Sequence, residues 1–175
     1  MESARKNILI TGFPGIGKTT LIKSLFEKLK HLNPAGFYTA EIREDGIRKG
    51  FELESFDGRK GILSHVDIKS LFRVGRYKVN IDGFEDFMDS IAFFNNETNL
   101  IIIDEIGKME CLSNKFRKLL KEILDSEKTV IATIALKSSG FIEEIKKQQD
   151  VRLFEITLKN RDTLLTEILN SINDC

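Results

Sequence analysis

The stretch GFPGIGKTT at residues 12–20 constrains the fold of this chain more than any other. Two glycines separated by four residues are followed by Lys18 and Thr19, which is the pattern of a phosphate-binding loop. A short apolar segment precedes the stretch and a segment with apolar residues at helical spacing follows it, as such a loop requires. Glycines let successive backbone N–H groups point at an anion, and the helix N-terminus adds partial positive charge. The sequence therefore predicts a nucleotide phosphate site built by Gly12, Phe13, Pro14, Gly15, Ile16, Gly17, Lys18, Thr19 and Thr20.

The last residues of this loop have separate expected tasks. Lys18 is expected to reach the β- and γ-phosphates and so to take part in catalysis. The hydroxyl of Thr19 is expected to coordinate Mg²⁺. Nucleoside triphosphates are therefore the expected ligands, and Mg²⁺ is the expected cofactor.

A predicted strand at residues 100–104 ends in two adjacent acids. Because its apolar residues do not alternate with polar ones, we expect it to be covered on both faces and central in a parallel sheet. In phosphate-binding domains such a strand ends in an aspartate that holds Mg²⁺ through its water shell, and Asp104 fits this role. Glu105 would then lie where the γ-phosphate is attacked, and it could deprotonate a water molecule. The alternative is that Glu105 is a solvated acid at a strand end.

Several residues near these motifs remain open between two interpretations. Lys108 could reach a phosphate or pair with an acid, and a plain surface lysine is an equal alternative. Arg161 lies at the start of an expected helix, where the helix dipole does not favour a positive charge. It is therefore either a nucleotide contact or part of a solvated helix start. Gly107 is expected to permit a sharp turn, and Met109 is expected to fill the core.

Composition limits the partners and the compartment. The chain has 175 residues, which suits a single domain over residues 1–175, and Lys plus Arg equals Asp plus Glu at 27 each. This balance gives no global field toward nucleic acid or a membrane surface, and the longest apolar run is too short to cross a bilayer. Cys111 and Cys175 lack metal-ligand spacing and are interpreted as free thiols, so a cytoplasmic protein is expected.

The order of patterns predicts an α/β fold with a mostly parallel sheet flanked by helices. Two Asp-Gly pairs, each typical of a tight hairpin, predict an antiparallel meander inserted at about 37–64, with strands at 37–43, 48–56 and 60–64. Residues 65–81 carry no clear pattern. By fold-level analogy, an acid directly after the metal aspartate predicts that the strand at 129–134 lies between those at 8–11 and 100–104.

Helix starts are predicted from capping residues. Asp82 with Glu85 three residues later resembles a capping box. Ser113 and Asn160 are expected to cap the two later helices that follow them.

Several segments together resemble the thermostable nucleoside-triphosphatase family, whose human member is called the cancer-related nucleoside triphosphatase. They include ILITGFPGIGKTTLIK, VGRYKVN, IIIDEIGKMECLSNKF and ITLKNRD, and the resemblance covers nearly the whole chain. It implies a monomeric RecA-like P-loop domain that hydrolyses ATP, GTP, CTP and UTP to diphosphates with Mg²⁺ and broad base tolerance. The family's second nucleotide-binding segment would fall on Ile103, Asp104, Glu105, Ile106, Gly107, Lys108, Met109 and Glu110.

Two other functions compete with hydrolysis. A phosphotransferase would use the same loop, Asp104 and Mg²⁺ to move the γ-phosphate to a nucleoside, a nucleotide or a polynucleotide end. Such an enzyme needs an acceptor pocket, which the meander and residues 65–81 could hold, and usually a cationic lid, which is not visible. A nucleotide-dependent switch that hydrolyses slowly is the third possibility. Glu105 beside Asp104 favours water as the acceptor.

Overall fold

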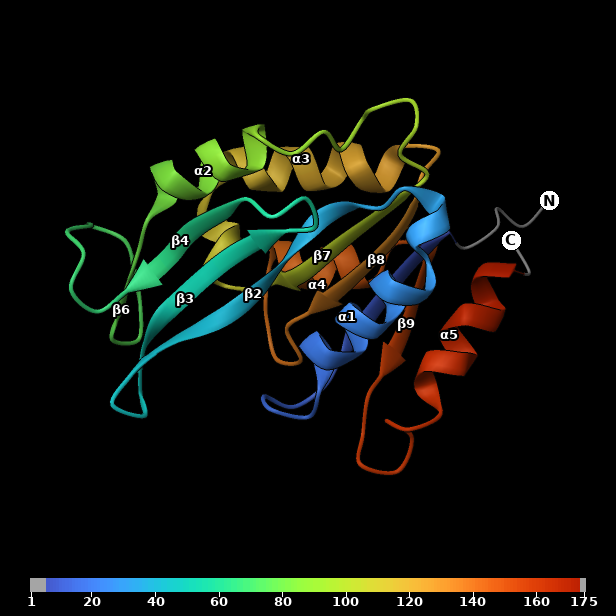
Figure 1. Cartoon of the computed structure of the whole chain (residues 1–175), viewed down its shortest axis with the longest axis horizontal. Coiled ribbons are helices and arrows are strands. Elements are labelled where there is room, and N and C mark those ends of the chain that lie inside the picture. Colours follow the sequence, from blue (N-terminus) through green and yellow to red (C-terminus); the bar gives the residue numbers. More distant parts are fainter. Residues whose placement is uncertain (1–5, 174–175) are drawn as a thin grey trace.

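The computed structural model describes residues 6–173, and within them the chain forms a nine-stranded sheet with helices on both faces (Figure 1). The strands are β1 (Asn7–Thr11), β2 (Ala35–Glu44), β3 (Ile47–Ser55), β4 (Lys60–His65), β5 (Arg73–Val74), β6 (Tyr77–Val79), β7 (Leu100–Ile106), β8 (Thr129–Ile134) and β9 (Val151–Glu155). Their spatial order is β5-β6-β4-β3-β2-β7-β8-β1-β9.

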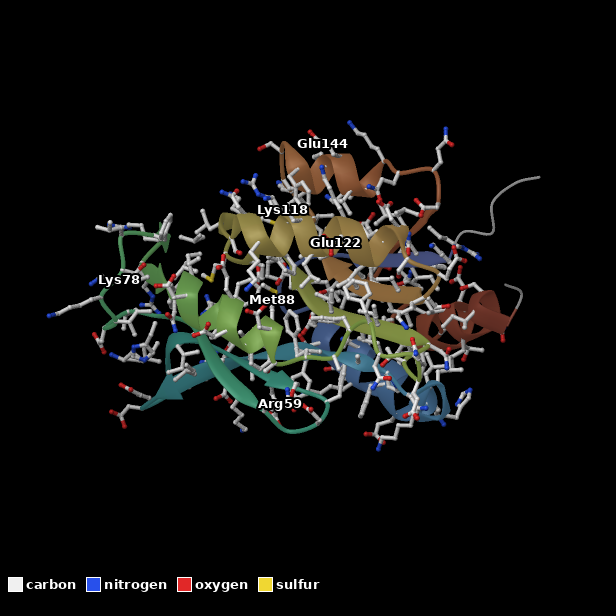
Figure 2. The ribbon with its side chains drawn as sticks, turned by 90° about the horizontal axis from the view of Figure 1, so that it is seen from above. Arg59, Lys78, Met88, Lys118, Glu122 and Glu144 are labelled. Carbon is white, nitrogen blue, oxygen red and sulfur yellow. The ribbon has the colours of Figure 1, made fainter. Side chains whose placement is uncertain are left out.

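Five α-helices cover this sheet in the described part of the chain: α1 (Lys18–Lys28), α2 (Ile81–Asp89), α3 (Asn114–Asp125), α4 (Phe141–Lys146) and α5 (Leu164–Asn173). Apolar residues of α1 and α5 pack against one face of the sheet. Those of α2, α3 and α4 pack against the other face. The exposed side chains Lys118, Glu122 and Glu144 project outward from this second helical layer (Figure 2).

One end of the sheet is parallel and has the predicted strand order. β8 pairs in parallel with both β1 and β7, so it lies between the strand before the phosphate loop and the strand of Asp104. Ile8 and Ile102 both align with Ile131 across these two pairings. The prediction for the strand at 129–134 is confirmed, and the carboxyl ends of β1, β7 and β8 lie at the same edge.

The other end of the sheet is antiparallel, and the predicted meander is confirmed as β2, β3 and β4. Asp45 and Gly46 both have positive φ, at 49° and 77°, as a tight hairpin requires. β2 pairs in parallel with β7 and antiparallel with β3, so the meander continues the central sheet. Residues 65–81 add a small hairpin, β5 and β6, which turns at Gly75.

Two predicted helix caps are wrong and one is confirmed. The cap of α2 is Asn80, whose side chain accepts a hydrogen bond from the backbone N–H of Gly83, whereas Asp82 lies inside the first turn. Asn160 instead accepts from the backbone N–H of Thr157, because it closes a turn ahead of α5, which begins only at Leu164. Ser113 caps α3 by accepting from the backbone N–H of Phe116, as predicted.

Candidate functional site

The phosphate loop joins β1 to α1 at the carboxyl edge of the parallel strands. Gly15 and Gly17 have φ values of 76° and 114°, which side-chain-bearing residues rarely adopt, so glycine is required there for backbone shape. The amino group of Lys18 donates to the carbonyl oxygens of Gly12 and Phe13 at 2.9 and 3.1 Å. The lysine therefore lies folded across its own loop, with its charge at the predicted phosphate position.

Asp104 draws three elements together at this edge. Its two carboxylate oxygens accept hydrogen bonds from the hydroxyls of Thr19 on α1, at 2.7 Å, and Thr133 on β8, at 2.6 Å. The carboxylate is 2% exposed, and these two hydroxyls compensate for its loss of water. β8 can supply Thr133 because it lies directly beside β7.

The oxygen donors of Thr19 and Asp104 fit a Mg²⁺ ion. Mg²⁺ keeps several waters and takes one or two carboxylates together with phosphate oxygens, so it does not need a protein cage. Among residues 6–173 there is no group of three or more His, Cys, Asp or Glu side chains that could hold a metal ion. The hydroxyl and the carboxylate, 2.7 Å apart, are the donor set that suits a nucleotide-bound Mg²⁺.

Glu105 stands at the junction of three cavities. A cavity of about 510 Å³ runs along the phosphate loop and is bounded on its far side by β2 and β3 through Thr39, Arg48 and Phe51. A second cavity, of about 340 Å³, lies between the start of the loop and Ala135, Leu136 and Lys137 after β8. A third, of about 200 Å³, lies on the other side of Glu105 and contains no residue of the phosphate loop.

The electrostatic surroundings of Glu105 increase its affinity for a proton. Burial raises the pKa of this carboxyl, and the negative charge of Asp104 raises it further. The nearby Lys18 ammonium opposes both effects. A carboxylate with raised pKa at the mouth of a phosphate site has the properties of a general base.

The turn after β7 contains a second buried acid, Glu110. Its side chain is 5% exposed, and burial together with the charge of Glu105 raises its pKa to about 8. A Cβ at Gly107 would lie 2.9 Å from a carboxylate oxygen of Glu110. The absence of a side chain at Gly107 therefore leaves room for the carboxyl group of Glu110. Glu110 is therefore neutral near pH 7 and lies close behind Glu105.

The remaining predicted residues divide into core and surface positions. Ile103 and Ile106 are 0% exposed, so their side chains belong to the core, and Met109 packs against the same cluster. Lys108 is exposed. Arg161 lies 3.8 Å from Asp162 and is not among the residues that line the three cavities.

Sequence reasoning did not identify Thr133, Arg48 or Phe51 as neighbours of the site. Thr133 carried a weak signal, because it is a polar residue inside the otherwise apolar strand Val130–Ile134. Arg48 and Phe51 gave none, since only the pairing of β3 with β2 brings them opposite the phosphate loop.

Among residues 6–173, no helix combines the length and the apolar character needed to cross a membrane. Cys111 is a free thiol, as predicted, whereas Cys175 lies outside the described residues.

Comparisons with known proteins agree with this geometry. The family model described as NTPase matches residues 7–169. The nucleoside-triphosphatase THEP1 of Thermotoga sp. (strain RQ2) is 53% identical over 164 residues, which cover 93% of each chain. The cancer-related nucleoside-triphosphatase homolog of Mus musculus is 37% identical and covers 94% of this chain and 95% of its own.

Solved structures give the same result. The crystal structure of THEP1 from Aquifex aeolicus superposes with a TM-score of 0.82 at 37% identity, covering 95% of this chain and 98% of the other. The solution structure of a human cancer-related nucleoside triphosphatase superposes with a TM-score of 0.80 at 33% identity, covering 96% and 97%. From the phosphate loop, the paired acids after β7 and these matches over almost its full length, the chain belongs to the nucleoside-triphosphatase family of P-loop proteins.

Proposed function

We propose that this protein hydrolyses nucleoside 5′-triphosphates, including ATP, GTP, CTP and UTP, to nucleoside diphosphate and phosphate with Mg²⁺. The observation that carries the proposal is the hydrogen bond of 2.7 Å between Thr19 and Asp104, with Glu105 directly beyond it. This arrangement supports separate roles for the two acids. One holds the metal ion, and the other prepares the attacking water.

In the proposed reaction the loop backbone and Lys18 bind the β- and γ-phosphates. Thr19 and Asp104 would hold Mg²⁺, and the ion would supply positive charge to the phosphate oxygens. Thr133 keeps the Asp104 carboxylate in place by its hydrogen bond of 2.6 Å. Glu105 orients a water molecule and accepts its proton as the oxygen bonds to the γ-phosphorus.

Base tolerance follows from where the polar contacts lie. The side chains with proposed roles contact the phosphates (Lys18), the metal ion (Thr19 and Asp104) or the attacking water (Glu105), and none of them contacts the base. Arg161 remains a candidate contact to the nucleotide, although its guanidinium is half exposed. We propose that recognition rests mainly on the triphosphate.

The test compares two isosteric changes in neighbouring acids. Glu105→Gln keeps the size of the side chain but removes the proton acceptor, so single-turnover hydrolysis should fall by roughly 10²–10⁴-fold while Mg²⁺·NTP still binds. Asp104→Asn should instead shift the Mg²⁺ titration to higher concentration, because that carboxylate holds the ion. Nucleotide affinity and single-turnover rates across a Mg²⁺ series measure both effects.

Glu144→Gln is the matched control, because Glu144 is an exposed acid on α4 at the surface of the helical layer (Figure 2). It should hydrolyse at the wild-type rate. Near wild-type hydrolysis by Glu105→Gln would contradict the assignment of the base and would move phosphoryl transfer to another acceptor ahead of hydrolysis.

A further inference from the structure

Arg48 on β3 lines the cavity along the phosphate loop, although it comes from the antiparallel end of the sheet. The cations that line this cavity are Lys18, Lys23 and Arg48, and the acids are Glu41, Asp104 and Glu105. Lys18 lies across its own loop, and the Lys23 ammonium lies 4.0 Å from the centre of the Tyr38 ring. Among the residues that line the cavity from β2 and β3, Arg48 is therefore the cation that faces the phosphate loop.

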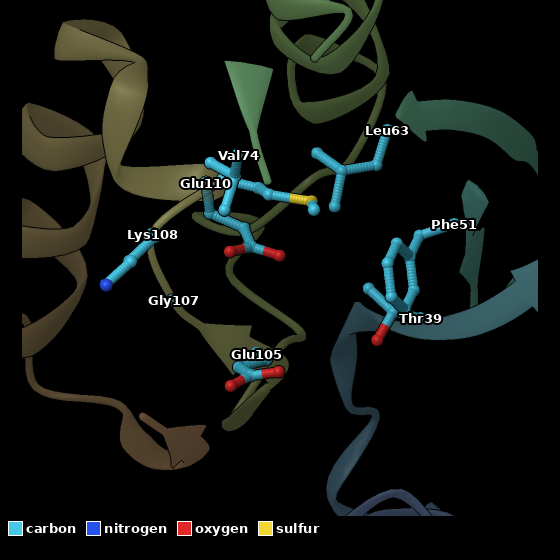
Figure 3. A pocket seen from close by; sticks show the side chains of 9 residues that line it. Thr39, Phe51, Leu63, Val74, Glu105, Gly107, Lys108 and Glu110 are labelled. Atoms are coloured by element: carbon cyan, nitrogen blue, oxygen red, sulfur yellow. The ribbon is translucent and has the colours of Figure 1, made fainter. Parts of the chain in front are cut away.

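Arg48 lies at the end of this cavity where Glu105 stands. Its guanidinium carbon is 5.2 Å from the centre of the Phe51 ring, and Phe51 lines both this cavity and the third cavity, on the other side of Glu105. Thr39 also lines both cavities, and Figure 3 shows Thr39 and Phe51 across from Glu105. Because Glu105 stands where the γ-phosphate would be attacked, the guanidinium lies next to the expected position of that phosphate.

Two hydrogen bonds fix the guanidinium group in place. Its Nε donates to the hydroxyl oxygen of Tyr77, and its Nη1 donates to the Glu41 carboxylate, each at 2.8 Å. The Tyr77 oxygen also accepts from Arg76 at 3.2 Å. Among residues 6–173 the remaining nitrogen of Arg48, Nη2, has no hydrogen-bond partner, and the side chain is 41% exposed. The group is therefore held in one position and keeps donors free for a ligand.

The carboxylate of Glu41 does not cancel the charge of Arg48. Its second oxygen bonds to Arg43, at 2.8 Å from Nε and 2.6 Å from Nη2, so two arginines share one negative charge. Arg43 also donates to the carbonyl oxygen of Gly46 at 2.8 Å, and it is not among the residues that line the three cavities around Glu105. The positive charge that remains can therefore act on the cavity through Arg48.

We propose that Arg48 donates hydrogen bonds to the γ-phosphate while this group is transferred to water, and that Tyr77 is the positioning residue for its guanidinium. The inference rests on the proposed hydrolysis. The water oxygen bonds to the γ-phosphorus and its proton passes to Glu105. The bond from that phosphorus to the β–γ bridging oxygen breaks, and its electron pair leaves with the nucleoside diphosphate. Fixed donors stabilise the charge that develops on these oxygens, and a planar guanidinium supplies several donors at once.

The experiment compares Arg48→Ala with the matched variant Arg43→Ala in the full chain. Both arginines bond to Glu41, but only Arg48 lines the cavity. In Arg48→Ala, single-turnover hydrolysis of Mg²⁺·ATP should fall by roughly 10²–10³-fold, while affinity for a non-hydrolysable ATP analogue should change by less than about tenfold. Arg43→Ala should hydrolyse at nearly the wild-type rate, and circular dichroism checks that both variants fold.

A mimic of the reacting phosphate separates contact during transfer from ordinary binding. ADP with Mg²⁺ and aluminium fluoride imitates the γ-phosphoryl group as it moves between two oxygens. Arg48→Ala should lose affinity for this complex by a much larger factor than for the non-hydrolysable analogue, because the lost interaction is strongest in the transition state. Arg43→Ala should bind both like the wild type.

Tyr77→Phe tests the positioning role. It keeps the ring, whose centre is 5.4 Å from that of Phe51, and removes the oxygen that accepts from Arg48. Hydrolysis should fall by roughly tenfold, the worth of one hydrogen bond to a charged group, with triphosphate affinity unchanged. The same change made in Arg48→Ala should cause no further loss, because the hydroxyl acts through that arginine.

The outcomes separate the inference from the proposed function. Wild-type hydrolysis together with near wild-type hydrolysis by Arg48→Ala overturns the inference and leaves hydrolysis standing. Equal losses in Arg48→Ala and Arg43→Ala, or equal weakening of the analogue and the fluoride complex, also overturn it. Independent losses from Tyr77→Phe and Arg48→Ala overturn the positioning role. A wild-type chain that releases no phosphate overturns the proposed hydrolysis itself, and the inference with it.

Discussion

The two ends of the sheet contribute different chemistry to the same site. At the parallel end, β1, β7 and β8 finish at one edge and deliver the phosphate loop, Asp104 and Thr133. At the antiparallel end, β2, β3 and β4 turn side-chain faces toward that edge and deliver Thr39, Phe51 and Leu63.

This difference follows from strand geometry. Parallel strands bring their carboxyl ends and the following loops together, which places backbone N–H groups and short polar side chains around an anion. An antiparallel meander instead presents the alternate side chains of one face, which makes a wall. The phosphate loop and Asp104 therefore belong to the parallel end, and the wall that faces Glu105 belongs to the antiparallel end. β2 joins the two, since it pairs with β7 on one side and β3 on the other.

The largest expected effect comes from removing the loop lysine of the parallel end. Lys18→Ala should abolish turnover, and it should weaken triphosphate affinity more than diphosphate affinity because the lost contact includes the γ-phosphate. Isothermal titration with both nucleotides and a phosphate-release assay measure the two effects. Lys28→Ala, an exposed lysine near the end of the same helix, is the control. Equal weakening of both affinities would mean that Lys18 does not reach the γ-phosphate.

The sequence predicted much of the parallel end because its signals are local. The phosphate loop is one continuous segment. The strand before Asp104 has only apolar residues, and this pattern alone predicts that the strand is buried. The hairpins of the meander could also be predicted from local sequence, since the pairs Asp45-Gly46 and Asp57-Gly58 are each typical of a tight turn.

The parts that escaped prediction depend on contacts between distant segments or on very short elements. β5 and β6 span two and three residues, too few for any periodicity. The burial of Glu110 arises only when its turn folds against the sheet, so its sequence context resembles that of a surface acid. The cap of α2 was misplaced because Asn80 and Asp82 are both acceptable caps, and only the backbone decides between them.

A middle-sized effect is expected where the two ends meet, at Glu110. Its pKa of about 8 in the folded protein lies above the ordinary value of 4.5, so between these pH values the folded state holds a proton that the unfolded state has lost. Stability therefore falls as pH rises through this window, by up to about 1.4 kcal/mol per pH unit, and levels off above it. Glu110→Gln stays neutral throughout and should escape this loss.

Urea denaturation at pH 5, 6, 7 and 8 tests this expectation. The variant and the wild type should be similar near pH 5, and the variant should become the more stable of the two toward pH 8. Glu122→Gln, an exposed acid on α3, is the control that should follow the wild-type curve (Figure 2). Parallel curves for Glu110→Gln and the wild type would mean that Glu110 is charged in the folded protein.

The smallest effect belongs to the antiparallel end alone, at the start of α2, which packs on that end of the sheet. Asn80→Ala removes the acceptor for the Gly83 N–H and a donor that reaches the carbonyl of Ile62 at 3.1 Å, so it should lower the free energy of unfolding by about 1 kcal/mol. Asp82→Ala loses only a favourable charge in the first turn, worth about 0.3–1 kcal/mol. Urea denaturation of both variants at one pH gives the comparison. Neither change should alter phosphate release, because α2 contributes no residue to the cavities around the phosphate loop. If Asp82→Ala costs more than Asn80→Ala, the cap is the aspartate that the sequence pattern favoured.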